Sequence, residues 1–211
     1  MTGGPETAGT IAAAVAVAFL IGAIPFGVLV GRIFYKTDVR RAGSGNIGAA
    51  NALRTLGKRG AIAVLLLDGL KGAVPVLAVA HAGGSAAVAC GVAFAAILGH
   101  CYSPFLRGRG GKGVATAFGA LWALSWPAGA TFTLVWIAAL IATGFASVAS
   151  MAASVAMPFA LWFLIGEPGL IYGFVTAVLI VFAHRENVAR LVAGTENVLP
   201  ILSKRPGATN G

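Results

Sequence analysis

Long apolar runs separated by short basic clusters make up most of the chain. Residues 7–31 form a run of 25 without charge, and further runs cover 60–81, 84–106 and 168–184. Between residues 113 and 166 there are 54 positions without Asp, Glu, Lys or Arg. A helix of about 20 apolar residues spans the roughly 30 Å hydrocarbon core of a bilayer. The pattern therefore predicts an all-α integral membrane protein.

The basic clusters between these runs predict the orientation of the chain. Arg and Lys concentrate in cytoplasmic loops, and basic clusters follow the first, third and last apolar runs. The long uncharged stretch must then cross an odd number of times, and three crossings of about 18 residues fit it, with turns near residues 126–129 and 143–145. We therefore predict seven transmembrane helices with the N-terminus outside and the C-terminus inside. Five spans is the competing count, in which the stretch holds one long tilted helix and re-entrant pieces.

The composition agrees with a membrane location. Of 211 residues, 58% are hydrophobic and 10% are charged, and the mean hydropathy is +0.90. Soluble domains carry about 25% charged residues, so a water-soluble globule is excluded, as is a disordered chain. The net charge of +9 fits basic loops that face anionic lipid, so we expect no nucleic-acid partner. We expect a single transmembrane domain over residues 1–211, with a mobile tail from about residue 205.

Three polar islands fall on the same side of the membrane in this topology. They are residues 41–51 with Arg54, residues 107–113, and residues 184–187 with 194–196. Each island combines glycine with a cation or an amide. Glycine allows backbone N–H groups to surround an anion, and Lys or Arg supplies the opposite charge. Together the islands predict a phosphate-binding floor at the cytoplasmic interface, whereas a single such loop fits a turn with lipid-facing cations at least as well.

The common nucleotide and metal motifs do not account for these islands. Residues 43–48 match the glycine spacing of a dinucleotide-binding loop, but a basic loop precedes them where that fold needs a strand. Gly113 follows Lys112 where a Walker loop has Ser or Thr for magnesium. The six carboxylates are scattered along the chain, so we expect no metal and no cofactor.

Several ionisable residues allow more than one interpretation. Asp68 and Lys71 lie three residues apart inside the second apolar run, where charges usually face a protein interior. They are either a pocket wall that supports the first island or a structural ion pair. His184, at the inner end of the last run, is a general base, a donor to an anion, or an interfacial histidine without a chemical role. We expect His81 and His100 to be mainly structural.

The three islands together resemble one family. Their sequences are SGNIGAAN (44–51) followed by Arg54 and by Gly57-Lys58, GGKGVAT (110–116), and HREN (184–187) followed by GTE (194–196). In order, spacing and expected sidedness they resemble the bacterial acyl-phosphate:glycerol-3-phosphate acyltransferases over nearly the whole chain. Ala50 and Gly108 depart from the residues common in that family, and neither change removes a charged group.

The resemblance implies an enzyme of the bacterial plasma membrane with its active site on the cytoplasmic side. It implies transfer of a fatty acyl group from acyl phosphate to the 1-hydroxyl of glycerol 3-phosphate. The products would be lysophosphatidic acid and inorganic phosphate, in the first acylation of phospholipid biosynthesis. The resemblance also implies functional coupling to a phosphate:acyl carrier protein acyltransferase.

The expected site residues come from all three islands. We expect Lys112 and Arg54 to bind phosphates, and Ser44 and Asn187 to position substrates. His184 is expected to donate to a phosphate or to orient the glycerol hydroxyl, whose proton the phosphate of the acyl donor can accept. These five residues are the expected catalytic set. The full predicted binding set is Ser44, Gly45, Asn46, Gly48, Asn51, Arg54, Gly110, Gly111, Lys112, Gly113, Thr116, His184 and Asn187.

Two other classes of function stay open at this point. A small transporter or channel for an anionic metabolite would also use cationic glycine loops and broken helices. Such a transport path should, however, place polar groups near the membrane midplane or on both sides. A non-catalytic lipid-binding or scaffold protein would tolerate Lys112→Ala without a change in any turnover.

Overall fold

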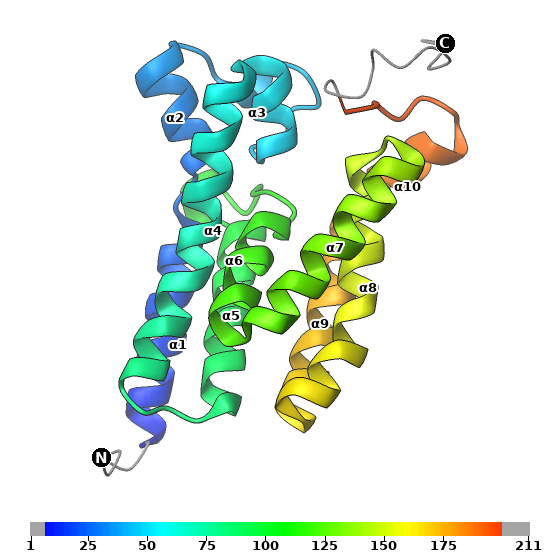
Figure 1. Cartoon of the computed structure of the whole chain (residues 1–211). Helices are drawn as coiled ribbons and strands as arrows, with labels where there is room; N and C mark the ends of the chain where they lie inside the picture. Colours follow the sequence, from blue (N-terminus) through cyan, green and yellow to red (C-terminus); the bar gives the residue numbers. More distant parts are fainter. Residues whose placement is uncertain (1–6, 200–211) are drawn as a thin grey trace.

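The computed structural model describes residues 7–199, and within them all regular structure is helical. The elements are α1 (Ala8–Ala23), α2 (Phe26–Tyr35), η1 (Val39–Arg41), α3 (Ala49–Thr55), α4 (Gly57–His81), α5 (Ala86–Cys101), η2 (Pro104–Leu106), α6 (Val114–Leu124), α7 (Trp126–Thr143), α8 (Ala146–Ile165), α9 (Glu167–Ala183) and α10 (Arg185–Val192). The long helices alternate in direction, and α2, α3 and α10 lie at the end opposite the start of α1 (Figure 1). The all-α prediction is confirmed, while the tail expected from residue 205 lies outside the described residues.

The first apolar run is broken rather than continuous. Pro25, which has no backbone N–H, separates α1 from α2. Such a break leaves backbone carbonyls without helical partners, which is costly in a membrane. Two of these carbonyls accept hydrogen bonds from other parts of the chain: Ser103 Oγ donates to Ala23 O at 2.6 Å, and Lys71 Nζ donates to Ile24 O at 2.9 Å. The break is thereby tied to α4 and to the segment after α5.

The predicted count of seven spans is not confirmed. Within residues 7–199, the segments long and apolar enough to cross a bilayer are Ala8–Tyr35, Gly57–His81, Ala86–Leu106, Trp126–Thr143 and Ala146–Ile165. A sixth results if α9 and α10, bent by 54°, count as one span. Residues 113–166 do contain three helices, but α6 has only 11 residues; at about 1.5 Å per residue it is roughly 16 Å long, too short for a full crossing. The chain is a multi-pass membrane protein, and the side on which each terminus lies stays a prediction.

Of the two turns predicted in this stretch, one lies at the predicted residues and the other lies one residue earlier. α7 ends at Thr143, and Gly144 adopts a left-handed conformation with φ of 79° before α8 begins, as predicted. The other turn falls at Ser125 rather than at residues 126–129. Pro127 lies in the first turn of α7, where a proline removes no helical hydrogen bond.

Glycines bring α6 close to the middle of α4. A Cβ atom at Gly72 would lie 2.0 Å from Thr116 O, and one at Gly119 would lie 1.9 Å from Gly69 O. Small residues allow membrane helices to approach to this distance. The packing fixes the start of α6, and hence the loop before it, against α4.

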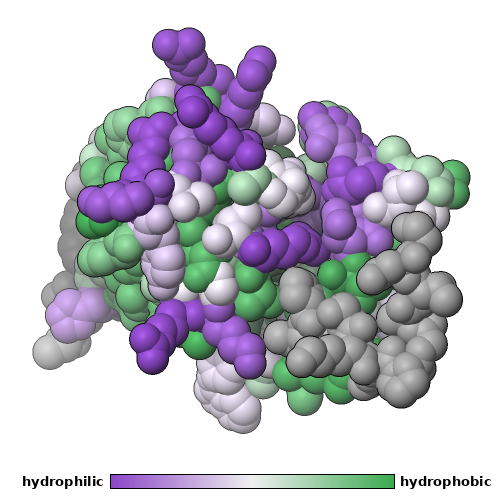
Figure 2. Space-filling view, turned by 90° about the horizontal axis from the view of Figure 1, so that it is seen from above, coloured by the Kyte–Doolittle hydropathy of each residue, from purple (hydrophilic) through white to green (hydrophobic). Residues whose placement is uncertain are grey.

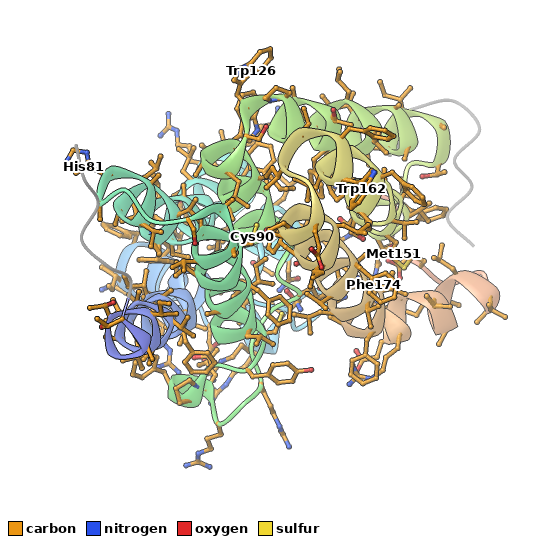
Figure 3. The ribbon with its side chains drawn as sticks, turned by 90° about the horizontal axis from the view of Figure 1, so that it is seen from below. His81, Cys90, Trp126, Met151, Trp162 and Phe174 are labelled. Carbon is orange, nitrogen blue, oxygen red and sulfur yellow. The ribbon has the colours of Figure 1, made fainter. Side chains whose placement is uncertain are left out.

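Apolar side chains cover the sides of the bundle, and polar ones gather at one end. Phe34 and Phe163 are exposed, as expected for side chains in contact with lipid. Hydrophilic residues gather on the face seen from the end that carries α2, α3 and α10 (Figure 2). From the opposite end, His81 and Trp126 project at the periphery, whereas Cys90 lies among the helices (Figure 3).

Candidate active site

All three polar islands contribute to one pocket. It has a volume of about 350 Å³ and is lined by residues of α3 to α8 and α10 and of the loops between them. One part of its wall is polar and includes Arg54, Lys112 and His184. The other part is apolar and is made by Leu65, Val114, Phe118, Phe132, Trp136 and Ile137. A cationic end and an apolar end thus share one cavity.

The first island is organised by a single buried amide. Asn51 Nδ2 donates to Val39 O at 2.8 Å, Ala42 O at 3.2 Å and Asn46 O at 2.7 Å. Asn51 Oδ1 accepts a hydrogen bond of 2.8 Å from Ser44 N. These contacts use the hydrogen-bonding capacity of the amide. Asn51 therefore shapes the loop, and it also lines the pocket, so its expected role as a substrate ligand stays a prediction.

The second island is held against the end of α5. Gly110 N donates to Cys101 O and Gly111 N donates to His100 O, both at 3.0 Å. A Cβ atom at Gly111 would lie 2.0 Å from His100 Nε2. Only glycine can therefore hold the backbone this close to the imidazole ring. The next residue is Lys112, which lines the polar end of the pocket.

The third island forms a hydrogen-bond network that includes the side chain of Lys112. Lys112 Nζ donates to Asn187 Oδ1, and Asn187 Nδ2 donates to Glu196 Oε1 at 2.5 Å. The same carboxylate accepts hydrogen bonds of 2.8 Å from Ser147 Oγ and from Arg190 Nε. Asn187 thus connects the ammonium group to a carboxylate that is fixed by two further residues.

His184 presents one ring nitrogen to the pocket. Its Nδ1 lies 2.7 Å from Ile180 O. Because a carbonyl oxygen can only accept, Nδ1 carries the hydrogen and the Nε2 of a neutral ring is an acceptor. His184 is buried and lines the pocket, so its accessible chemistry is that of a hydrogen-bond acceptor.

The charges at the polar end shift the pKa of two groups. Burial and the positive charge of Arg190 together lower the pKa of Lys112 to about 8, against the opposing effect of the Glu196 carboxylate. Burial raises the pKa of Glu196, but hydrogen bonds from Asn187, Ser147 and Arg190 outweigh it, so the net pKa is lowered. An ammonium group with a depressed pKa beside a second cation favours an anionic ligand.

The sequence matches the family model described as glycerol-3-phosphate acyltransferase over residues 12–194. A glycerol-3-phosphate acyltransferase of Brucella anthropi is 41% identical over 189 residues, which cover 89% of this chain and 92% of that protein. The enzyme of that name from Rubrobacter xylanophilus is 45% identical over 181 residues, covering 84% and 89%. The chain belongs to the glycerol-3-phosphate acyltransferase family.

Solved structures of this acyltransferase family share the fold. One is a crystal structure of PlsY (YgiH), an integral membrane glycerol 3-phosphate acyltransferase, in its glycerol 3-phosphate form. It matches with a TM-score of 0.86 and 35% identity over 92% of this chain and 98% of its own. The lysophosphatidic acid form matches with a TM-score of 0.83 and 34% identity over 90% and 95%. The resemblance expected from the three islands is thereby confirmed at the level of family and fold.

Most of the residues predicted for the acyltransferase site lie in the pocket. The pocket is lined by Ser44, Asn46, Gly48, Asn51, Arg54, Lys112, Gly113, His184 and Asn187. Gly45, Gly110 and Gly111 do not line it. Gly110 and Gly111 support the site through the backbone contacts to α5, and Gly45 closes a turn of the first island with a hydrogen bond to Ala42 O.

Thr116, like the three glycines, is a predicted site residue that does not line the pocket. Its side chain is fully buried and does not line the pocket. Thr116 is the third residue of α6, at the close contact with Gly72 of α4. Its presence next to the second island in sequence made it a candidate, but the helix turns it towards α4.

The expected site set lacked Glu196, Arg190, Ser147, Asp68 and His100, all of which line the pocket. Glu196 belongs to the third island, and this membership was the sequence feature that could have marked it as a site residue. Ser147 lies in an uncharged run and gave no signal. Asp68 was considered as a pocket wall, whereas His100 was assigned to the structure alone.

Proposed function

We propose that this member of the acyltransferase family transfers a fatty acyl group from acyl phosphate to the 1-hydroxyl of sn-glycerol 3-phosphate. The hydroxyl oxygen forms an ester bond with the acyl carbonyl carbon, and the bond between that carbon and the phosphate oxygen breaks. The hydroxyl proton leaves with inorganic phosphate, and the other product is lysophosphatidic acid. The observation that carries this proposal is the pocket that joins a cationic end to an apolar end.

The two ends of the pocket match the two parts of an acyl phosphate. Arg54, Lys112 and Arg190 supply positive charge for phosphate groups. On the apolar side, Leu65 and Ile137 line the pocket and are each 43% exposed, so this wall is not sealed inside the bundle. An acyl chain can therefore leave the pocket towards lipid while its phosphate stays at the polar end.

The proposed roles follow from the partners of each side chain. Lys112 and Arg54 bind the substrate phosphates, and Asn187 orients Lys112. Ser44 lies at the rim of the pocket, where its hydroxyl can donate to a phosphate oxygen. His184 Nε2 accepts a hydrogen bond from the glycerol hydroxyl and aims the oxygen at the acyl carbon.

The proton does not need a protein base in this scheme. An acyl phosphate has a good leaving group, and its own phosphate oxygen can take the hydroxyl proton. The enzyme then contributes mainly orientation and electrostatic stabilisation. Replacement of His184 by Gln keeps a side-chain oxygen that can accept this hydrogen bond, so it is expected to retain more activity than His184→Ala. Equal loss of activity in the Gln and Ala variants would instead make His184 the base, because neither side chain can take up the proton.

The proposed reaction implies a location and a partner. Phosphorylated substrates are made in the cytoplasm, so we place the polar end of the pocket on the cytoplasmic side of the bacterial plasma membrane. The acyl phosphate must come from an enzyme that transfers acyl groups to phosphate, such as a phosphate:acyl carrier protein acyltransferase.

The direct test uses purified protein in lipid with palmitoyl phosphate and radiolabelled glycerol 3-phosphate, without added metal or acyl-CoA. Labelled lysophosphatidic acid is expected from the wild type. Lys112→Ala is expected to lower its formation by about 10²–10³-fold, the range for removal of one group that stabilises transition-state charge. Arg59→Ala removes an exposed cation outside the pocket and is the control.

The outcomes separate the function classes. No product with either acyl donor, from protein that remains folded, would contradict an acyltransferase and favour a carrier for an anionic metabolite. Full activity of Lys112→Ala would contradict the assigned phosphate ligand. Product from acyl-CoA but not from acyl phosphate would contradict the proposed donor.

A further inference from the structure

Three ionisable side chains lie buried beneath the polar end of the pocket. Asp68, Lys71 and His100 are 0%, 3% and 3% exposed. Asp68 and Lys71 belong to α4, and His100 lies near the end of α5. Ionisable groups inside a membrane protein are costly and generally mark functional positions. The phosphate-binding roles proposed above use none of the three.

The first link joins the cluster to the helix bundle. Lys71 Nζ lies 2.7 Å from Asp68 Oδ1 and also donates to Ile24 O. Lys71 thus neutralises Asp68 and fixes α4 to the break between α1 and α2. His100 Nδ1 lies 3.7 Å from the same Asp68 oxygen. The carboxylate faces the Nδ1 edge of the imidazole ring at ion-pair distance, beyond the range of a hydrogen bond.

The second link joins the cluster to the pocket. The opposite ring nitrogen of His100, Nε2, faces Gly111, where a Cβ atom would approach it to 2.0 Å. Gly111 N also donates to His100 O at 3.0 Å. The ring and the carbonyl of one residue therefore support the backbone immediately before Lys112.

We propose that Asp68 and His100 are positioning residues that act through Lys112. Asp68 orients the imidazole ring, and the ring supports the Gly111 backbone. This support holds the Lys112 ammonium group at the polar end of the pocket, where it meets the substrate phosphate. The inference rests on the proposed function of Lys112 as a phosphate ligand.

A purely structural cluster would behave differently from a positioning cluster. If the three residues only packed the bundle, their replacement would lower activity by the same factor whether or not Lys112 is present. If His100 acts through Lys112, its effect should largely disappear once Lys112 is removed. Residues that act as one unit give such non-additive effects in a double-mutant cycle.

The experiment measures kcat/KM for glycerol 3-phosphate in wild type, His100→Asn, Lys112→Ala and the double variant. Asn keeps a polar group for Asp68 but removes the ring beneath Gly111. We expect His100→Asn to lower kcat/KM by about 10- to 100-fold, the scale of a misplaced catalytic group. In the Lys112→Ala background, where residual turnover is followed by radiolabel, the same change should cost less than about twofold. Thermal unfolding in detergent monitors the fold of each variant.

Val92→Ala is the matched control. Val92 is buried in the same helix and packs towards α1 without touching the loop. We expect it to lower the unfolding temperature but to change kcat/KM by a similar small factor in both backgrounds. If His100→Asn does not fold, Asp68→Asn, which keeps the side-chain volume, tests the same coupling.

The results distinguish the two proposals. Equal factors for His100→Asn in both backgrounds, or no effect in either, would overturn the positioning role while leaving Lys112 as the phosphate ligand. Loss of the His100 effect with Lys112 absent would support it. Wild-type activity of Lys112→Ala would instead remove the proposed function on which the inference rests.

Discussion

Two glycine-rich loops reach the same pocket, but they are held in place by different means. The loop before α3 is organised from within, because Asn51 of α3 bonds to three carbonyls and one N–H of the chain just before it. The loop before α6 is organised from outside, by the end of α5 and by Asn187 of α10. Local sequence thus determines the shape of the first loop, whereas tertiary packing determines the second.

This difference predicts different consequences of substitution. A change in the first loop should affect stability and activity together, because the loop and the start of α3 form one unit. A change in the second loop should affect activity more than stability, because its backbone depends on contacts that mainly place one side chain. The following predictions test this contrast.

The largest effect on stability is expected from Asn51→Ala. The substitution leaves three carbonyls and the Ser44 N–H without their shared partner. A buried polar group without a partner costs about 1–3 kcal/mol, and only the contact with Val39 O is fully buried, so we expect a loss of roughly 3 kcal/mol in the free energy of unfolding. Denaturant or thermal unfolding in detergent measures it. An unfolding temperature equal to that of the wild type would contradict the self-contained loop.

The first loop also indicates how far sequence reasoning reaches. The glycines and amides of residues 44–51 correctly predicted a loop at the pocket. They did not distinguish Asn51, which holds the loop, from Ser44, which lies at the pocket rim. A polar side chain can either hold a loop or bind a substrate, and only the positions of its hydrogen-bond partners decide which it does.

The second loop and the short helix after it show where the sequence falls short. The position of Lys112 was predicted from charge and glycine spacing, but the support by His100 depends on packing between α5 and the loop. Likewise, a run of apolar residues predicts that a helix lies in the membrane, not that α6 ends after 11 residues. The hydropathy of residues 113–166 fits three helices of equal length as well as the unequal helices that the structure contains. The helix boundaries therefore depend on tertiary packing.

A smaller effect, on activity above all, is expected from Gly111→Ala. The added methyl group would overlap the buried His100 ring and displace the backbone before Lys112. We expect kcat/KM to fall by about tenfold, measured with the radiolabelled acylation assay. Gly91→Ala is the matched control, because a Cβ atom there meets nothing within 4 Å. Wild-type activity of Gly111→Ala would show that the close contact with His100 is not required.

The ionisation of Lys112 provides a test that leaves the covalent structure of the loop unchanged. Its pKa is lowered to about 8, and only the protonated form carries the charge that attracts phosphate. The free enzyme should therefore be mostly protonated at pH 7 and mostly neutral at pH 9, so kcat/KM should fall by about tenfold per pH unit above 8. Lys112→Arg remains protonated in this range and should lack the limb. An alkaline limb of equal position in the Arg variant would assign it to another group.

The smallest effect is expected from Thr116→Val, which removes the hydroxyl of a predicted ligand while keeping the shape of its side chain. Within residues 7–199 no group pairs with Thr116 Oγ1, and the side chain is buried against α4 rather than exposed to the pocket. Removal of a buried hydroxyl without a partner should leave kcat/KM within about twofold and stabilise the fold by up to about 1 kcal/mol. Steady-state kinetics and thermal unfolding of one preparation measure both. A tenfold or larger loss of kcat/KM without destabilisation would mean that the hydroxyl contacts substrate after all, and that the second loop and the start of α6 rearrange when substrate binds.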